Sequence, residues 1–229
     1  MGVSGPSIFN ARYKIDNGNW DVAIAPSGNP DPVSGLFQLN IGNTASLNNT
    51  WLDFEAKFTV GLGYTWTVSN PADPANNITK WYINLVCPCT AAPTCATGTC
   101  TLPAPGGMVN NVGPKDSYNV IQLTATARSP TPTTTEVRNL MLTINGADQC
   151  GRFADMTAVS TNPLPSTPTT QYIVSDGDLS STSWTLTGQV KIQGSWTTNP
   201  NEANKFDIYT QPFYNQIFTT CQNSACPQV

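Results

Sequence analysis

Two carboxylates of this sequence have a spacing that could support catalysis. Asp53 and Glu55 lie two residues apart, which places both on one face of a β-strand. A glycoside hydrolase uses such a pair across a cleft, with the pKa of one carboxyl raised by burial. Lys57 continues the same alternation, which is more typical of a solvated strand surface than of a cleft. We therefore expect no catalysis at this pair.

The chain contains no histidine among its 229 residues. Histidine is the side chain most often used as a general base, and it is the commonest metal ligand. Its absence excludes Ser-His-Asp and Cys-His catalysis. We predict that the protein is not an enzyme, and a hydrolase that uses carboxylates alone is the remaining catalytic alternative.

The seven cysteines favour disulfide bonds and an oxidising compartment. Because seven is odd, one thiol either stays unpaired or bonds to another chain, and both alternatives remain open. The first four could also form a zinc site, but their C-x-C-x₅-C-x₄-C spacing differs from the paired C-x₂-C of common zinc ribbons. The cross-link candidates are Cys87, Cys89, Cys95, Cys100, Cys150, Cys221 and Cys226.

Two further features suggest ligands. The carboxylates of Asp176 and Asp178 could hold calcium, with a simple Asp-Gly-Asp turn as the alternative. We expect no cofactor, with calcium as the one exception left open. Trp66 and Trp184 share the parity of the apolar residues of their strands and are expected in the core. Trp51 is off that parity and is expected at the surface, where its ring could stack on a sugar.

The composition limits the classes of partner. Only 10% of the residues are charged, against about 25% in an ordinary domain, and hydroxyl and amide side chains replace them. The net charge of −4 and the pI of about 4.6 make nucleic acid an unfavourable partner. No stretch approaches the roughly 20 apolar residues of a membrane-spanning helix, so we expect no membrane insertion. The first residues show no signal peptide, so either a signal was removed or the protein leaves the cell by assembly or lysis.

Alternation of apolar and polar residues indicates β-strands. It runs from Leu52 to Val68, where Gly61 and Gly63 predict a bend, bulge or tight turn, and it returns from Trp184 to Trp196. Asn17-Gly18 predicts a type I′ hairpin, and no window has the apolar stripe of a helix. Shorter strands are expected at 20–25, 36–41, 80–86, 119–127, 139–145, 171–175 and 205–211.

Nine or ten strands at this spacing predict an all-β fold, an antiparallel β-sandwich of jelly-roll or immunoglobulin-like type. We expect residues 1–229 to form a single domain, with a split near residue 130 as the less favoured alternative. A Cys/Pro-rich loop at 87–114 is too long for an ordinary connection, and we expect local disulfides such as Cys95–Cys100 to hold it. A cysteine-containing tail follows at 212–229.

One region has a family resemblance. It contains Val137-Arg-Asn-Leu-Met-Leu-Thr-Ile-Asn-Gly146, then Asp176-Gly-Asp-Leu-Ser180, then Trp184-Thr-Leu-Thr-Gly188. Together with Trp196 and Phe206-Asp-Ile208, these motifs resemble the C-terminal half of choice-of-anchor domains of bacterial, notably cyanobacterial, cell surfaces. The resemblance covers residues 137–211 and implies an exported surface domain without catalytic residues. The cysteines depart from that pattern.

These features predict a non-catalytic structural subunit of an extracellular or particle-surface assembly, such as an appendage, sheath, coat or fibre. Its expected partners are copies of itself or other surface subunits, with disulfide cross-links between them. One alternative is a minor capsid, decoration or spike protein on a virion surface. The other is a carbohydrate-binding adhesin module that binds glycans.

Overall fold

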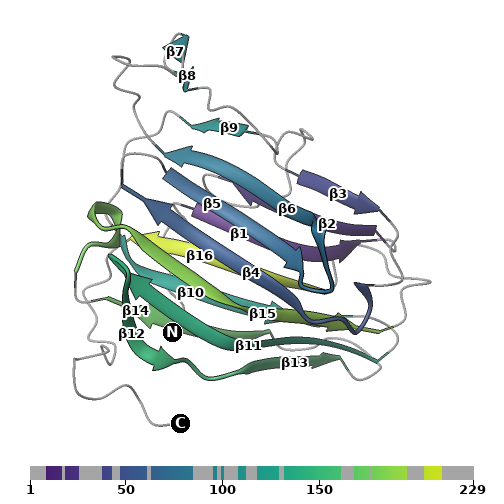
Figure 1. The fold of residues 1–229 in the computed structure, drawn as a ribbon. Helices are drawn as coiled ribbons and strands as arrows, with labels where there is room; N and C mark the ends of the chain where they lie inside the picture. Colours follow the sequence, from purple (N-terminus) through teal and green to yellow (C-terminus); the bar gives the residue numbers. More distant parts are fainter. Residues whose placement is uncertain are drawn as a thin grey trace.

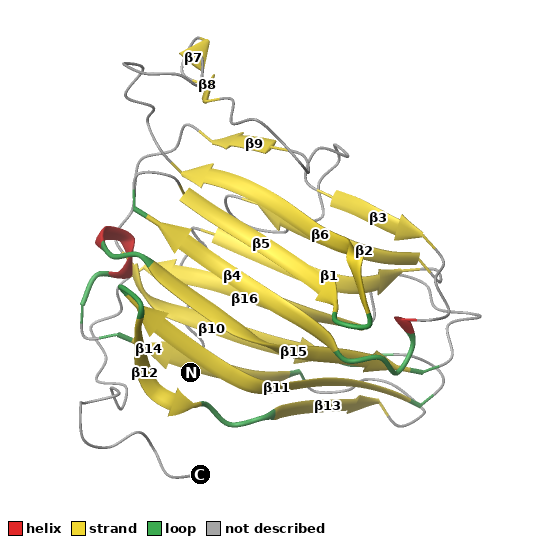
Figure 2. Ribbon diagram, viewed as in Figure 1, coloured by secondary structure: helices red, strands yellow, loops and turns green. Residues whose placement is uncertain are grey.

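The computed structural model describes residues 9–16, 19–25, 38–42, 47–60, 63–84, 95–96, 99–100, 108–111, 118–128, 132–160, 168–175, 177–194 and 204–212. This part of the chain is almost entirely β-strand, as Figure 2 shows. Its helical structure consists of short turns, including the 3₁₀ turn η2 at Leu179–Ser181. The all-β expectation is confirmed.

The strands form two large sheets that lie in two layers (Figure 1). The six-stranded sheet has the order β14-β10-β16-β1-β2-β3. Its strands are β1 (Phe9–Asp16), β2 (Asn19–Ala25), β3 (Gln38–Gly42), β10 (Tyr118–Thr126), β14 (Thr169–Val174) and β16 (Asn204–Pro212).

The eight-stranded sheet has the order β12-β11-β15-β4-β5-β6-β9, and β13 also pairs with β11. Its strands are β4 (Leu52–Thr59), β5 (Gly63–Asn70), β6 (Asp73–Asn84), β9 (Met108–Asn111), β11 (Thr133–Ile144), β12 (Ala147–Arg152), β13 (Met156–Ser160) and β15 (Trp184–Gln193). Only β6 and β9 pair in parallel among the described strands.

The pairing is nested, which identifies a jelly roll. The first described strand, β1, pairs with the last, β16. Closer to the middle of the chain, β4 pairs with β15, and β10 pairs with β14. The innermost pairs join β11 to β12 and β13. An immunoglobulin-like sandwich places its first and last strands in different sheets, so this alternative is wrong. Strands from both sides of residue 130 share each of the two large sheets.

Inward-facing side chains of both sheets build one apolar core. Two groups of aromatic rings lie in it, and within each group the centroids of contacting rings are 4.7 to 6.5 Å apart. Both buried indole N–H groups have acceptors: Trp184 donates to the Tyr118 hydroxyl at 2.8 Å, and Trp66 donates to the Arg12 carbonyl at 3.1 Å. The expectation that both tryptophans are core residues is confirmed. One group contains Phe54, Trp66 and Phe206, and the other contains Phe58, Tyr64, Tyr118 and Trp184.

The turns follow the sequence signals. The run from Leu52 to Val68 divides into β4 and β5, with Phe58 opposite Tyr64, so the tight turn was the correct alternative. Asn145 and Gly146 have φ values of 50° and 78° between β11 and β12, as a type I′ turn requires. Asp16 pairs with Asn19, which leaves a two-residue connection at the expected Asn17-Gly18 hairpin.

Strand β11 begins at Thr133, earlier than expected. The sequence did not reveal its first half because the alternation of buried and exposed residues shifts by one position in the middle of the strand. Val137 and Leu140 are both buried although they are three residues apart. The change occurs at a β-bulge, where two residues of β11, Asn139 and Leu140, lie opposite Gly188 of β15. Asn139 has a φ of 56°, a left-handed conformation that asparagine tolerates better than most residues. Alternation alone therefore detected only the second half of the strand.

The described residues contain sixteen strands, more than the nine or ten expected. β12 and β13 were missed because they are short edge strands. Within the 87–114 loop, β7 (Cys95–Ala96) and β8 (Thr99–Cys100) form a small hairpin beyond the β6–β9 end of the large sheet (Figure 1). That loop therefore contains pieces of strand rather than only irregular structure.

A Gly188→Ala variant should be less stable by about 1–3 kcal/mol, the usual cost of overpacking. A Cβ atom there would lie 2.7 Å from Cζ of Phe54 and 3.1 Å from the Arg138 carbonyl oxygen. Urea unfolding measures the change. Gly177→Ala is the matched control, because a Cβ at that position meets nothing within 4 Å. Equal midpoints for the two variants would contradict the packing described here.

Candidate functional site

A hollow of about 500 Å³ lies on the outer face of the eight-stranded sheet. Asp53 of β4 lies opposite Ser69 of β5 and Gln189 of β15. In the next row, Glu55 lies opposite Thr67 and Thr187. We call this region the outer hollow. It is lined by Asp53, Phe54, Glu55, Thr67, Ser69, Asn139, Thr187, Gly188 and Gln189.

The two carboxylates of the outer hollow are less exposed than a solvated strand face would make them. Asp53 and Glu55 are both half-buried, whereas Lys57 on the same face is exposed. Within the described residues, Glu55 has no hydrogen-bond or ion-pair partner. The sequence located both carboxylates on one face, but it did not show that they share a concave surface.

Three strands contribute to a hydrogen-bond network beside the hollow. The Gln189 side-chain oxygen accepts from Arg138 Nε at 2.9 Å and from Asn139 Nδ2 at 3.1 Å. These two donors fix the amide orientation, so Gln189 Nε2 points toward Asp53 and donates to its Oδ1 at 2.8 Å. The Asn139 backbone N–H donates to Asp155 at 3.2 Å. The bulge of β11 therefore positions a carboxylate two strands away.

Trp51 lies beside this network on the same sheet face, in agreement with its expected parity. Its side chain is half-buried. The Arg138 guanidinium carbon lies 3.7 Å from the ring centroid and Lys191 Nζ lies 4.8 Å from it, which are cation–π distances. Lys191 also pairs with Glu136 at 3.1 Å. Arg138 already covers part of the ring, and a sugar-stacking role for Trp51 stays a prediction.

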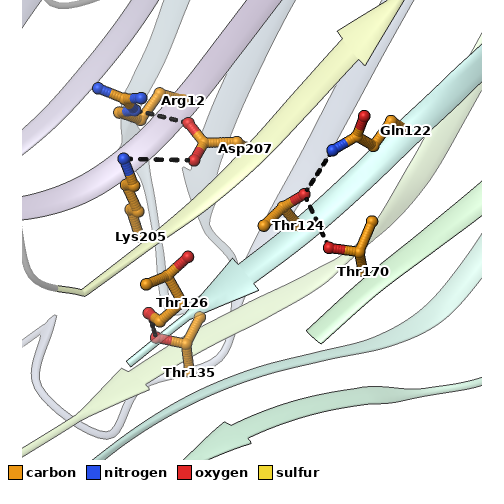
Figure 3. A network of polar contacts seen from close by, with 8 residues as sticks. All are labelled: Arg12, Gln122, Thr124, Thr126, Thr135, Thr170, Lys205 and Asp207. Carbon is orange, nitrogen blue, oxygen red and sulfur yellow. Dashed lines mark hydrogen bonds and ion pairs between the residues drawn. The ribbon is translucent and has the colours of Figure 1, made fainter. Parts of the chain in front are cut away.

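The outer face of the six-stranded sheet contains a buried ion pair (Figure 3). Arg12 of β1 lies opposite Asp207 of β16, and Arg12 Nε donates to Asp207 Oδ1 at 2.5 Å. The two side chains are only 3% and 1% exposed. Lys205 Nζ lies 3.7 Å from the second Asp207 oxygen. Nearby on this face, Gln122 of β10 donates to Thr124, which bonds to Thr170 of β14.

This pair affects the protonation of its neighbours. Burial lowers the pKa of Arg12, but the charge and hydrogen bond of Asp207 outweigh it and leave the pKa above its ordinary value. Burial and then the charge of Asp207 raise the pKa of Tyr209 to about 12. Both shifts keep Arg12 charged and Tyr209 neutral across the physiological pH range. The cluster is therefore suited to holding strands together rather than to proton transfer.

The calcium candidates are only partly described. Asp178 caps η2: its Oδ1 accepts from the Ser180 N–H at 2.8 Å and from the Tyr118 N–H at 3.3 Å. This is the turn interpretation of that residue. Asp176 lies outside the described residues. Among the described positions, no group of three or more His, Cys, Asp or Glu side chains could hold a metal ion, and calcium binding stays a prediction.

The cysteines are located only through the backbone. Cys95 and Cys100 are direct partners in the β7–β8 hairpin. Opposite residues of an antiparallel pair have Cα atoms about 4.5–5.5 Å apart, a separation that suits a disulfide, so the Cys95–Cys100 bond stays a prediction compatible with the register. Cys150 lies in β12. Cys87, Cys89, Cys221 and Cys226 lie outside the described residues.

Comparison with protein-family models and with curated proteins gives no match. The resemblance to choice-of-anchor domains therefore has neither support nor contradiction from relatives. Among the described residues, no helix is long and apolar enough to cross a membrane.

The sequence did not reveal the residues that organise either outer face. Arg12 and Asp207 are separated by 195 positions, so no local pattern connects them. Gln189 looked like one of several polar residues on the outer face of its strand. The parity change between Val137 and Leu140 was the one available signal for the bulge, and it would have directed attention to Asn139.

We expect Arg12→Met to destabilise the fold by about 3 kcal/mol, since it leaves the Asp207 carboxylate buried without its main partner. The double variant Arg12→Met/Asp207→Leu should recover most of this loss. Lys191→Met, which removes a more exposed pair, should cost under about 1 kcal/mol. Urea unfolding of the three variants tests this, and a double variant as unstable as Arg12→Met would refute the explanation.

Stability should fall as the pH rises above the ordinary tyrosine pKa of 10.0 toward about 12. Folded Tyr209 binds its proton more tightly than the unfolded chain does, so this contribution is fully present below pH 10.0 and is lost at higher pH. Unfolding free energies measured across this range should decline less steeply for Tyr209→Phe than for the unmodified protein. Parallel declines would show that Tyr209 does not contribute.

Proposed function

We propose that this protein is a non-catalytic structural subunit of an extracellular or particle-surface assembly. One observation carries the proposal: within the described part of the chain, β13 and β14 are edge strands of the two large sheets and lie on the same side. Within the described residues, β13 pairs only with β11 and β14 pairs only with β10. The two strands are adjacent, because the Thr169 hydroxyl donates to the Thr157 carbonyl at 2.8 Å.

These edge strands, β13 (MTAVS) and β14 (TTQYIV), contain no charged residue and no proline. Natural edge strands commonly carry such residues, which oppose pairing with another chain. Val159 of β13 is 49% exposed and Tyr172 of β14 is 36% exposed, so apolar surface accompanies these edge strands. This combination favours addition of a strand from a neighbouring subunit.

Other properties are consistent with this role. Charged side chains on both outer faces form cross-strand pairs, such as Arg12 with Asp207 and Lys191 with Glu136, so these charges are used within the sandwich. A disulfide within the 87–114 loop and an interchain bond from the odd cysteine would add covalent links. The same arguments apply to a minor capsid, decoration or spike subunit of a virion, which is a variant of this proposal.

Negative-stain electron microscopy of protein purified without reductant tests the assembly. We expect filaments, sheets or shells from the unmodified protein and dispersed single molecules from Val159→Lys, because a charge on β13 opposes edge pairing. Val60→Lys is the matched control. Val60 is similarly exposed, at 46%, but it lies after β4 in the turn toward β5, so this variant should still assemble.

Two results would contradict the proposal. If the unmodified protein gave only dispersed molecules, the proposed structural role would be wrong. Normal particles from Val159→Lys would show that the contact between subunits lies elsewhere than at β13 and β14. Adding reductant to preformed particles separates the contributions, because particles held by strand pairing alone should survive and those held by interchain disulfides should dissociate.

A further inference from the structure

We propose that the outer hollow is a binding site for a neutral saccharide, with Asp53 and Glu55 as the main acceptors of its hydroxyl groups. The site lies on the outer face of the eight-stranded sheet. It involves none of the residues of the β13–β14 side, so it is independent of the assembly proposed above.

Side-chain size explains why the hollow exists. Its two rows contain short or half-buried side chains on three neighbouring strands, β5, β4 and β15. Longer side chains occupy the adjoining positions of the same face, with Lys57 beyond Glu55 and Trp51 before Asp53. Serine and threonine between long side chains leave a depression on an otherwise flat sheet. Its volume of about 500 Å³ falls within the range of small-molecule sites.

The acceptor in the first row is held in place before any ligand arrives. Arg138 and Asn139 fix the amide of Gln189, and this amide holds one oxygen of Asp53 at 2.8 Å. A carboxylate oxygen has two lone pairs and there are two oxygens, so Asp53 can accept further hydrogen bonds. Such preorganisation reduces the entropy lost on binding.

The acceptor in the second row has no partner within the described residues. Glu55 is half-buried and lies between Thr67 and Thr187. Hydrogen bonds to a carboxylate are about twice as strong as those between neutral groups. A ligand that donates here therefore gains more than it would from the surrounding hydroxyl groups.

The lining chemistry selects a polyol. Its side chains present carboxylates that only accept, amide groups that donate and hydroxyls that do both, which matches the mixed donors and acceptors of sugar hydroxyls. The two negative charges disfavour phosphorylated or acidic ligands. Seven of the nine lining residues have a polar side chain, so a wholly apolar ligand such as a lipid is not favoured. A metal ion is not favoured, because the described residues have no cluster of three or more ligating side chains.

Retention of the folded protein on immobilised neutral polysaccharides tests the proposal, with mannan, dextran, galactan and chitin as probes and polylysine as a charge control. We expect retention on at least one polysaccharide and elution by its free sugar. Asp53→Asn and Glu55→Gln should each weaken binding roughly tenfold or more, the loss of one hydrogen bond to a charged group. Asp148→Asn, an exposed carboxylate outside the hollow, should bind normally.

Circular dichroism and thermal melting establish that each variant is folded. No retention on any polysaccharide, or equal retention of the Asp53→Asn/Glu55→Gln double variant, would overturn the proposal. Retention on polylysine alone, abolished by salt, would assign the hollow to basic peptides instead. If the protein released reducing sugar from a polysaccharide and Glu55→Gln abolished this release, the hollow would be a hydrolytic site rather than a binding site. Val159→Lys should keep its sugar retention, so failure of the assembly and failure of this site give different results.

Discussion

Successive side chains of a β-strand point to opposite faces of its sheet, and β11 must obey this rule while pairing along its whole length. Val137 and Leu140 both belong to the core, which an unbroken strand does not allow. The extra residue at Asn139 removes the conflict and keeps both halves of β11 on the core. Gly188 opposite the bulge leaves the space that the Phe54 ring occupies. The centre of the eight-stranded sheet depends on this local arrangement.

The bulge in β11 also makes the polar groups on the outer face of the eight-stranded sheet differ from those on the outer face of the six-stranded sheet. At the bulge, Arg138 and Asn139 converge on Gln189, so the outer face of the eight-stranded sheet acquires an oriented amide beside an open hollow. The outer face of the six-stranded sheet has no such irregularity between β1 and β16, and Arg12 simply meets Asp207 in register. One face therefore has a carboxylate oriented beside a hollow, whereas the charged pair of the other face is buried.

Much of the fold could be predicted because alternation and turn residues are local signals. The strand containing Trp184 and the hairpin at Asn17-Gly18 were identified in this way. The jelly-roll order could not be chosen, since it depends on which distant strands pair. The candidate site was partly visible: Asp53 and its neighbouring carboxylate were recognised, but their hollow arises from side chains on three strands. Gln189 gained its role only from the register that places it opposite Asp53.

The nested pairing also determines when this protein can fold. β16 lies between β1 and β10 and pairs with both. A ribosome makes β1 and β10 long before β16. The backbone edges of β1 and β10 that pair with β16 therefore stay unpaired until β16 emerges. Contacts between such distant parts of a chain also form slowly. The six-stranded sheet can therefore be completed only after β16 has been synthesised.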